Sequence, residues 1–273
     1  MDFVNKNLSL FQDILINICY NHNCKKTLWK GFAPMSNEFQ SERDIEKEFE
    51  EIFESEEAHY LIARRAHDYA KLMAYYRCAI MEVETKFKVL NEEFSLRLDR
   101  NPIENIKSRL KRPISIRNKL KKYGYALTMS NIEEQLHDVA GIRVICSFPS
   151  DVYTIAEALL SQDDVTLIQM KDYIKNPKPS GYRSLHLIIE IPIFLAKEKR
   201  MMKVEIQLRT IAMDCWASLE HQIRYKKDFV FTDEMAAELS HCADISADLD
   251  ERMETLRKIV RNNPEKDDSI KII

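Results

Sequence analysis

Between residues 141 and 209 the apolar side chains recur at every second position, whereas before and after this segment they recur at every third or fourth. A period of two is that of a β-strand, and the longer period is that of an α-helix. The stretches "GIRVICSF", "VTLIQMK", "SLHLIIEI" and "MMKVEIQLR" are therefore predicted to be strands. A sheet in the middle of the chain with long helices at both ends predicts an α+β fold.

Each of the two long helices carries an apolar stripe typical of packed helices. The first helix runs to about Leu98, and its stripe consists of Met73, Tyr76, Ile80, Val83, Phe87, Leu90 and Phe94. The second covers residues 232–260, with a stripe of Leu239, Cys242, Leu249, Met253, Leu256 and Val260. Such stripes pack within the chain or against a second subunit, so a homo-oligomer is one expected outcome.

Shorter helices are predicted around the strands. Residues 102–124 are expected to form short helices broken at Pro113. Residues 151–162 are expected to form a helix capped by Asp151, and residues 210–226 another capped by Thr210.

Charge and hydropathy limit the class of protein. The 273 residues carry a formal net charge of −3, so the chain is not a general nucleic-acid binder and any basic site must be local. It contains no apolar run of about 18 residues, and its N-terminus does not read as a signal peptide. We therefore expect a cytoplasmic protein without a membrane segment.

The predicted strands present one apolar face and one polar face. In "MMKVEIQLR" the polar face carries Lys203, Glu205, Gln207 and Arg209. Arg143 and His186 lie opposite the apolar residues of their own strands. A sheet face that only meets water is a simpler explanation, but such a face rarely combines a carboxylate, an amide, an imidazole and guanidiniums. Convergent ionisable groups favour a functional site.

The residue types on this face suit phosphoryl transfer. Asp138 and Glu205 could hold a magnesium ion together with phosphate oxygens. The Lys and Arg residues of 107–122 and of the loop after 170 could neutralise a triphosphate. Arginine and Tyr182 offer stacking surfaces, and Gln207 can hydrogen-bond a base or ribose edge. The sequence has no Walker-type glycine-rich loop, which argues against a P-loop enzyme.

Four segments in this order resemble the synthetase domain of the RelA/SpoT-type small alarmone synthetases: "SRLKRPISIRNKL", "HDVAGIRVICSF", "KDYIKNPKPSGYRSLHLI" and "VEIQLRTIAMDCWASLEH". The resemblance implies a mixed, mostly antiparallel sheet wrapped by helices, in a nucleotidyltransferase-like arrangement. It also implies three parts: an N-terminal extension over 1–55, the synthetase domain over 56–228, and a C-terminal helix and tail over 229–273.

The activity implied by the resemblance is that of a GTP or GDP pyrophosphokinase, which moves the β,γ-pyrophosphate of ATP to the ribose 3′-hydroxyl of GDP or GTP and leaves AMP. Asp138 and Glu205 would bind Mg²⁺, and Glu205 would alternatively act as the base on the 3′-hydroxyl. The residues implied for ATP are Arg109 and Arg143 around the adenine, with Lys111, Ser115, Lys119, Lys171 and Lys178 at the phosphates. Those implied for the acceptor are Tyr182, Arg183, His186 and Gln207.

Two alternatives remain open from the sequence. Some relatives with the same motifs are toxins of toxin–antitoxin pairs that modify the 3′ CCA end of tRNA, or that act on adenine nucleotides. Lys25, Lys26 and Lys30 around Trp29 could form a basic platform for tRNA, and an antitoxin protein would then be a partner. The other alternative is a non-catalytic nucleotide- or RNA-binding module on the same fold. The complete set of expected catalytic residues favours an enzyme, and the acidic net charge favours a nucleotide acceptor.

Overall fold

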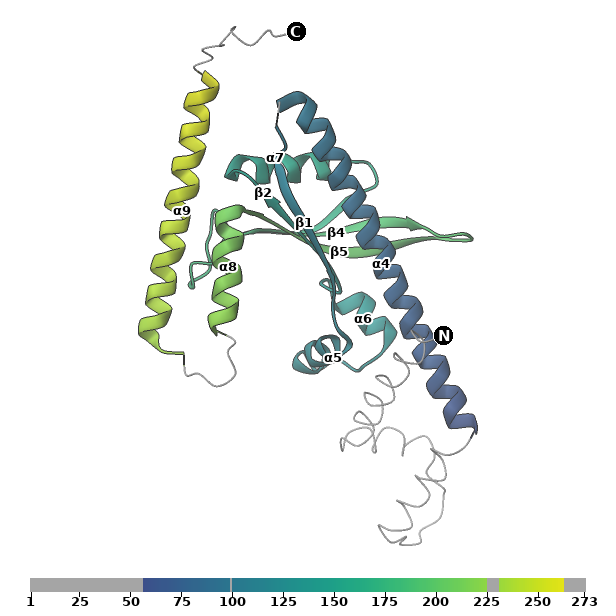
Figure 1. The fold of residues 1–273 in the computed structure, drawn as a ribbon. Coiled ribbons are helices and arrows are strands. Elements are labelled where there is room, and N and C mark those ends of the chain that lie inside the picture. Colours follow the sequence, from purple (N-terminus) through teal and green to yellow (C-terminus); the bar gives the residue numbers. More distant parts are fainter. Residues whose placement is uncertain (1–55, 99, 225–230, 263–273) are drawn as a thin grey trace, which may run out of the picture.

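The computed structural model describes residues 56–98, 100–224 and 231–262 (Figure 1). The described elements are α4 (Glu56–Leu98), β1 (Ile103–Leu110), α5 (Pro113–Lys122), α6 (Met129–Gln135), β2 (Ala140–Cys146), α7 (Pro149–Leu160), β3 (Thr166–Asp172), β4 (Leu185–Phe194), β5 (Lys199–Thr210), α8 (Ile211–Arg224) and α9 (Asp233–Asn262). The expected N-terminal extension over 1–55, including Lys25, Lys26 and Lys30, lies outside the described residues.

The five strands form one mixed sheet in the order β1-β2-β5-β4-β3. Strands β2 and β5 are parallel, and the other three pairs are antiparallel. The α+β fold with a mixed, mostly antiparallel sheet and long helices near both ends is therefore confirmed.

Helices α4 and α7 cover the apolar face of the sheet, and α5, α6 and α8 lie toward its other face (Figure 1). All seven stripe residues of α4 are buried in the core, where they meet Val204, Ile206 and Leu208 of β5. The first apolar stripe therefore packs within its own chain. Burial of that face directs the alternate residues of β2, β4 and β5 away from the core.

Two local predictions were wrong. Residues 103–110 form strand β1, not a helix, because they pair along their length with β2. Asp151 is not the cap of α7, which begins at Pro149; it lies in the first turn, 2.6 Å from Arg100 and 3.1 Å from Arg257. The predicted cap at Thr210 is confirmed, since its hydroxyl accepts a hydrogen bond from the Met213 amide at 3.1 Å.

Unlike an ordinary surface helix, α9 buries polar side chains and exposes most of its apolar stripe. Its inward face buries Ala243, Asp250 and Glu254, while its apolar stripe points outward, with Leu256 54% exposed and Val260 73% exposed. Of the second predicted stripe, Leu239 packs against the cluster of Trp216, Ala217 and Ala243, whereas the part from Leu249 to Val260 does not pack against the sheet domain. Among the helices described, none is long and apolar enough to cross a membrane.

Candidate active site

A single row of polar side chains crosses all five strands of the sheet. Its members, from β1 to β3, are Lys107, Arg143, Gln207, His186 and Lys171, and each is the register partner of the next. They come from segments up to 100 positions apart, and only the strand order places them side by side. The structure thus brings Arg143, Gln207, His186 and Lys171 of the predicted site together on one line.

A second row lies two residues further along the strands, on the same face. Arg109 of β1 is the register partner of Gly141 in β2, and Gly141 is the partner of Glu205 in β5. Because residues two apart on a strand share a face, Glu205 and Gln207 are neighbours, and the Gln207 amide donates to the Glu205 carboxylate at 3.2 Å. The predicted donor residue Arg109 and the predicted base Glu205 therefore belong to one surface.

Asp138 lies between α6 and β2 and is held by two lysines. The Nζ atoms of Lys111 and Lys119 lie 2.6 Å and 2.7 Å from its Oδ2 atom. Burial alone would raise the pKa of this carboxyl, but the hydrogen bonds from the two lysines outweigh that effect and lower the pKa. Asp138 is therefore ionised, and two predicted phosphate-binding lysines are gathered on it.

Glu205 has the opposite electrostatic character. Burial raises the pKa of its carboxyl, and the nearby negative charge of Asp138 raises it further. A carboxylate with a raised pKa is a better proton acceptor than an ordinary surface glutamate. The ionised Asp138 therefore suits the neutralisation of positive charge, whereas Glu205 suits proton abstraction.

The carboxyl pair also fits a magnesium ion. The Oδ1 atom of Asp138 is buried and has no hydrogen-bond partner among the described residues, so it is available to a cation. No cluster of three or more His, Cys, Asp or Glu side chains suited to a metal occurs within the described ranges. Mg²⁺ is commonly bound by one or two carboxylates, with substrate phosphates and water completing its coordination.

The loop between β3 and β4 carries an aromatic cluster at the end of the row. The Tyr182 hydroxyl lies 2.8 Å from Nε2 of His186, and the Tyr173 ring lies 5.2 Å from the His186 ring. The Nζ atom of Lys178 lies 4.6 Å from the centre of the Tyr182 ring and 4.7 Å from that of Tyr173. Tyr173 was not among the predicted site residues, although it stands beside "KNPKPSGY" in the sequence.

His186 is neutral in this setting. Burial lowers its pKa to about 3, and the positive charges of Arg209, Lys178, Lys171 and Arg143 act in the same direction. Its Nδ1 atom lies 3.8 Å from Glu205, but an uncharged ring makes no ion pair there. His186 therefore serves as a hydrogen-bonding group and not as a cation.

Arg209 and Asp214 form a buried link that sequence reasoning did not assign to the site. Arg209 is 3% exposed; its guanidinium donates to the Tyr182 hydroxyl at 2.6 Å, to the Gln207 side-chain oxygen at 3.0 Å and to Asp214 at 3.2 Å. Asp214, in the first turn of α8, also accepts from Arg143 at 3.1 Å. The sequence signal for Arg209 was its position on the polar face of β5.

Two other predicted residues lie apart from the rows. Ser115 is in the first turn of α5, whose N-cap Arg112 makes no side-chain capping hydrogen bond. Amide groups at such a helix start suit a phosphate oxygen. The Arg183 side chain turns toward α9 and donates to the Ala243 carbonyl oxygen at 3.2 Å, so its role in acceptor binding stays a prediction.

A hollow of about 250 Å³ opens beside the site and not at it. It is lined by Tyr76, Glu133, Glu134, Glu190, Arg200, Met201, Met202 and Lys203. Its basic groups are already engaged: Arg200 pairs with Glu133, and Lys203 donates to the carbonyl oxygens of Glu133 and Glu134 at 3.3 Å. We assign this hollow no substrate role.

The sequence of this chain is similar to those of known proteins. Residues 108–229 match the family described as "Region found in RelA / SpoT proteins". The chain is 45% identical over 193 residues to GTP pyrophosphokinase YwaC of Bacillus subtilis (strain 168), which covers 71% of this chain and 92% of that protein.

Solved structures share the fold. The small alarmone synthetase 2 from Bacillus subtilis has a TM-score of 0.65 and 44% identity, over 71% of this chain and 100% of that one. The small alarmone synthetase 1 from the same organism was solved bound to its product pppGpp, with a TM-score of 0.64 and 32% identity over 71% and 98% of the two chains. Bound to AMPCPP, it has a TM-score of 0.61 and 28% identity over 72% and 100%.

The fold and the site thus define a protein of the RelA/SpoT class. Within that class, the chain belongs to the small alarmone synthetases. The resemblance drawn from the four sequence segments is confirmed.

Proposed function

We propose that this chain transfers the β,γ-pyrophosphate of ATP to the ribose 3′-hydroxyl of GDP or GTP, producing the alarmone (p)ppGpp and AMP. The observation that carries the proposal is the position of two carboxyls, Asp138 held by two lysines and Glu205 on β5, beside a row of polar and cationic side chains. The names of the relatives support it, because they are GTP pyrophosphokinases and one was solved with pppGpp.

On the donor side, we assign adenine to Arg109 and Arg143, which lie on the adjacent strands β1 and β2. Lys111, Ser115 and Lys119 would meet the phosphates from α5 and its approach. The relative bound to AMPCPP supports ATP as the donor. Without a ligand, Lys111 and Lys119 pair with the Asp138 carboxylate. When ATP binds, a phosphate would replace that carboxylate as the anionic partner of the two lysines. Lys171 and Lys178 would complete the phosphate contacts from β3 and the following loop.

On the acceptor side, Tyr182 would stack on the guanine, with His186 and Gln207 hydrogen-bonding near the ribose. The 3′-oxygen forms a bond to the β-phosphorus, while the bond from that phosphorus to the oxygen bridging to the α-phosphate breaks and AMP leaves. Glu205 takes the hydroxyl proton, since its raised pKa makes it the better proton acceptor of the two carboxyls. Holding the 3′-hydroxyl in line with the β-phosphorus lowers the reaction barrier more than the raised pKa of Glu205 does.

We also propose that Asp138, through its unpartnered Oδ1 atom, holds Mg²⁺ together with phosphate oxygens. Glu205 is the alternative second ligand of the ion, in place of its role as the base. The bound ion would supply neutralisation of charge on the transferred group. Because the substrates are cytoplasmic nucleotides, we place the enzyme in the cytoplasm.

The test is transfer of label from ATP carrying labelled γ-phosphate, with Mg²⁺ and the full chain, to one acceptor per tube: GDP, GTP, AMP or deacylated tRNA. Label in a guanine nucleotide supports the proposal. Label in tRNA would overturn the choice of acceptor and identify a translation-blocking toxin with an antitoxin to be sought. ATP binding without transfer to any acceptor would identify a non-catalytic binding module.

We further propose that the outward apolar stripe of α9 packs against a second copy of the chain. Leu249, Met253, Leu256 and Val260 are 52%, 46%, 54% and 73% exposed and recur at steps of three and four. A repeat of this kind is self-complementary, and continuous exposed stripes usually mark an interface. Light scattering should give a multiple of the 32.2 kDa monomer mass, and Leu256→Glu should reduce it. A monomer mass for the unmodified chain would contradict the homo-oligomer.

A further inference from the structure

The loop that carries Tyr182 rests directly on the C-terminal helix. Gly181 has a φ of +84°, in the left-handed region that favours glycine. A Cβ atom built on Gly181 would lie 2.5 Å from the Cβ of Ala243, and 3.6 Å from the Cα of Ser240. Two small residues thus allow the loop backbone and α9 to approach each other closely.

Further contacts join the same two segments. The Arg183 guanidinium donates to the carbonyl oxygens of Gly181 and Ala243, both at 3.2 Å, and to Asp244 at 3.4 Å. Tyr182 itself packs on the small apolar cluster of Trp216, Ala217 and Ala243. Both residues that flank Tyr182 therefore contact α9.

Helix α9 is fixed on both sides of Ala243. On the N-terminal side, the Trp216 indole donates to the carbonyl oxygen of Leu239 at 2.8 Å. On the C-terminal side, the Thr210 hydroxyl, at the end of β5, donates to the buried Asp250 carboxylate at 2.6 Å. Because Thr210 adjoins Arg209, this contact ties α9 to the strand that carries the site.

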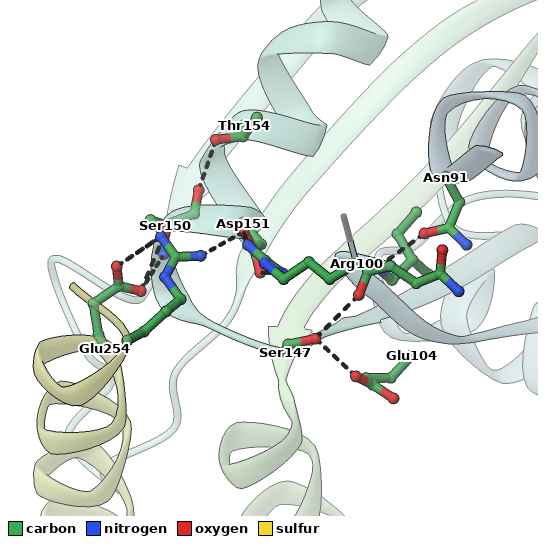
Figure 2. A network of polar contacts seen from close by, with 11 residues as sticks. Asn91, Arg100, Glu104, Ser147, Ser150, Asp151, Thr154 and Glu254 are labelled. Carbon is green, nitrogen blue, oxygen red and sulfur yellow. Dashed lines mark hydrogen bonds and ion pairs between the residues drawn. The ribbon is translucent and has the colours of Figure 1, made fainter. Parts of the chain in front are cut away.

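A third anchor joins α9 to the start of α7 (Figure 2). The Ser150 hydroxyl lies 3.0 Å from a Glu254 oxygen, and Arg257 bridges Glu254 at 3.0 Å and Asp151 at 3.1 Å. Asp151 is held in turn by Arg100 at 2.6 Å. With anchors on both sides, α9 offers Gly181 a surface of fixed position.

We propose that α9 is a positioning element of the acceptor site, and that Ala243 is the residue through which it holds Tyr182 in place. The inference rests on the proposed function, because it concerns the binding of the guanine acceptor. A side chain larger than alanine at 243 displaces either the loop or the helix. In both cases Tyr182 loses its position, while the donor residues on β1 and α5 keep theirs.

The experiment compares Ala243→Leu and Ala243→Val with Ala237→Leu, which alters an exposed alanine of the same helix. Steady-state transfer is measured with ATP and GDP varied in turn. The KM for GDP should rise by on the order of tenfold or more in Ala243→Leu and by less in Ala243→Val, since small displacements of a reactant are costly. The KM for ATP should rise less than the KM for GDP in both, because Lys178 is the one proposed donor residue bonded to this loop, through the Gly181 amide at 2.8 Å. Both KM values should stay within about twofold in Ala237→Leu.

The outcomes separate this inference from the proposed function. If the unmodified chain transfers no label to GDP or GTP, the proposed function fails and the inference fails with it. If the unmodified chain is active and Ala243→Leu leaves the KM for GDP unchanged, only the inference is overturned. Equal rises in both KM values, with a lower melting temperature, would show general destabilisation and also overturn it.

Discussion

The Nη2 atom of Arg209 donates a hydrogen bond of 2.6 Å to the hydroxyl of Tyr182. Arg209 is almost fully buried, and its second amino group reaches Asp214, which also accepts from Arg143. Tyr182, which we assign to the guanine of the acceptor, is therefore connected to Arg143, which we assign to the adenine of ATP. The connection runs through the guanidinium of Arg209 and the carboxylate of Asp214. Charge-assisted hydrogen bonds of this kind fix geometry more firmly than neutral ones.

Replacing Arg209 with lysine tests this connection. Lysine keeps the positive charge beside Asp214 but cannot reach Tyr182, Gln207 and Asp214 together, because its three donors are on one nitrogen instead of being spread over a planar guanidinium. We expect the KM for GDP to rise by on the order of tenfold, with a smaller rise for ATP through Arg143. Steady-state kinetics with each substrate varied would measure both changes.

The control for this variant is Arg224→Lys, because Arg224 is exposed and its contacts, an ion pair with Glu220 and a cation–π contact with Phe231, involve no site residue. It should leave both KM values unchanged. If Arg209→Lys behaves like this control, the positions of Tyr182 and Arg143 do not depend on Arg209.

Asp138→Asn tests the assignment of the metal. The amide cannot replace an anionic oxygen ligand, so the Mg²⁺ concentration for half-maximal activity should rise by on the order of a hundredfold. Chelation of the metal should abolish transfer by the unmodified chain. Asp164→Asn is a matched control, since Asp164 also pairs with a lysine, Lys86, at 2.7 Å. An unchanged Mg²⁺ dependence in Asp138→Asn would remove Asp138 from the metal site.

The protonation of His186 gives a pH test. Its pKa is lowered to about 3, so the folded chain should keep the ring neutral where an ordinary histidine, with a pKa of 6.5, becomes charged. As the pH falls below that ordinary value, the unfolded chain takes up this proton first, and folding loses stability until the pH reaches the lowered value.

NMR of the His186 ring should therefore show no titration near 6.5, and the acid loss of stability should be smaller in His186→Gln. The comparison requires that the variant keep its fold at neutral pH, which circular dichroism would check. A ring that titrates at the ordinary histidine pKa would contradict a buried, neutral His186.

The sequence predicted strands β2, β3, β4 and β5, but it did not predict the edge strand β1. In "IENIKSRL" the apolar residues Ile103, Ile106 and Leu110 recur at helical steps, which indicated a helix. The segment is nevertheless strand β1, because pairing with β2 satisfies its backbone and overrides the local pattern. An edge strand with one covered side gives only a weak alternation of burial.

The site was predictable as a set of residue types but not as a surface. The polar face of β5 placed Glu205, Gln207 and Arg209 together, since residues two apart share a face. The row from Lys107 to Lys171 depends on the strand order and on the parallel pairing of β2 with β5, which no local pattern encodes. The contact of Gly181 with Ala243 joins positions 62 residues apart and required the position of α9.

Glu205→Gln provides the most direct test of the central claim, that the polar face of the sheet is the catalytic surface and Glu205 its base. The substitution keeps the size of the side chain but replaces the carboxylate with an amide, which cannot accept the proton. Transfer of labelled pyrophosphate from ATP to GDP should fall by on the order of 10² to 10⁴ in kcat, while the affinities for ATP and GDP change little. Turnover by Glu205→Gln within a few fold of the unmodified chain would contradict the account.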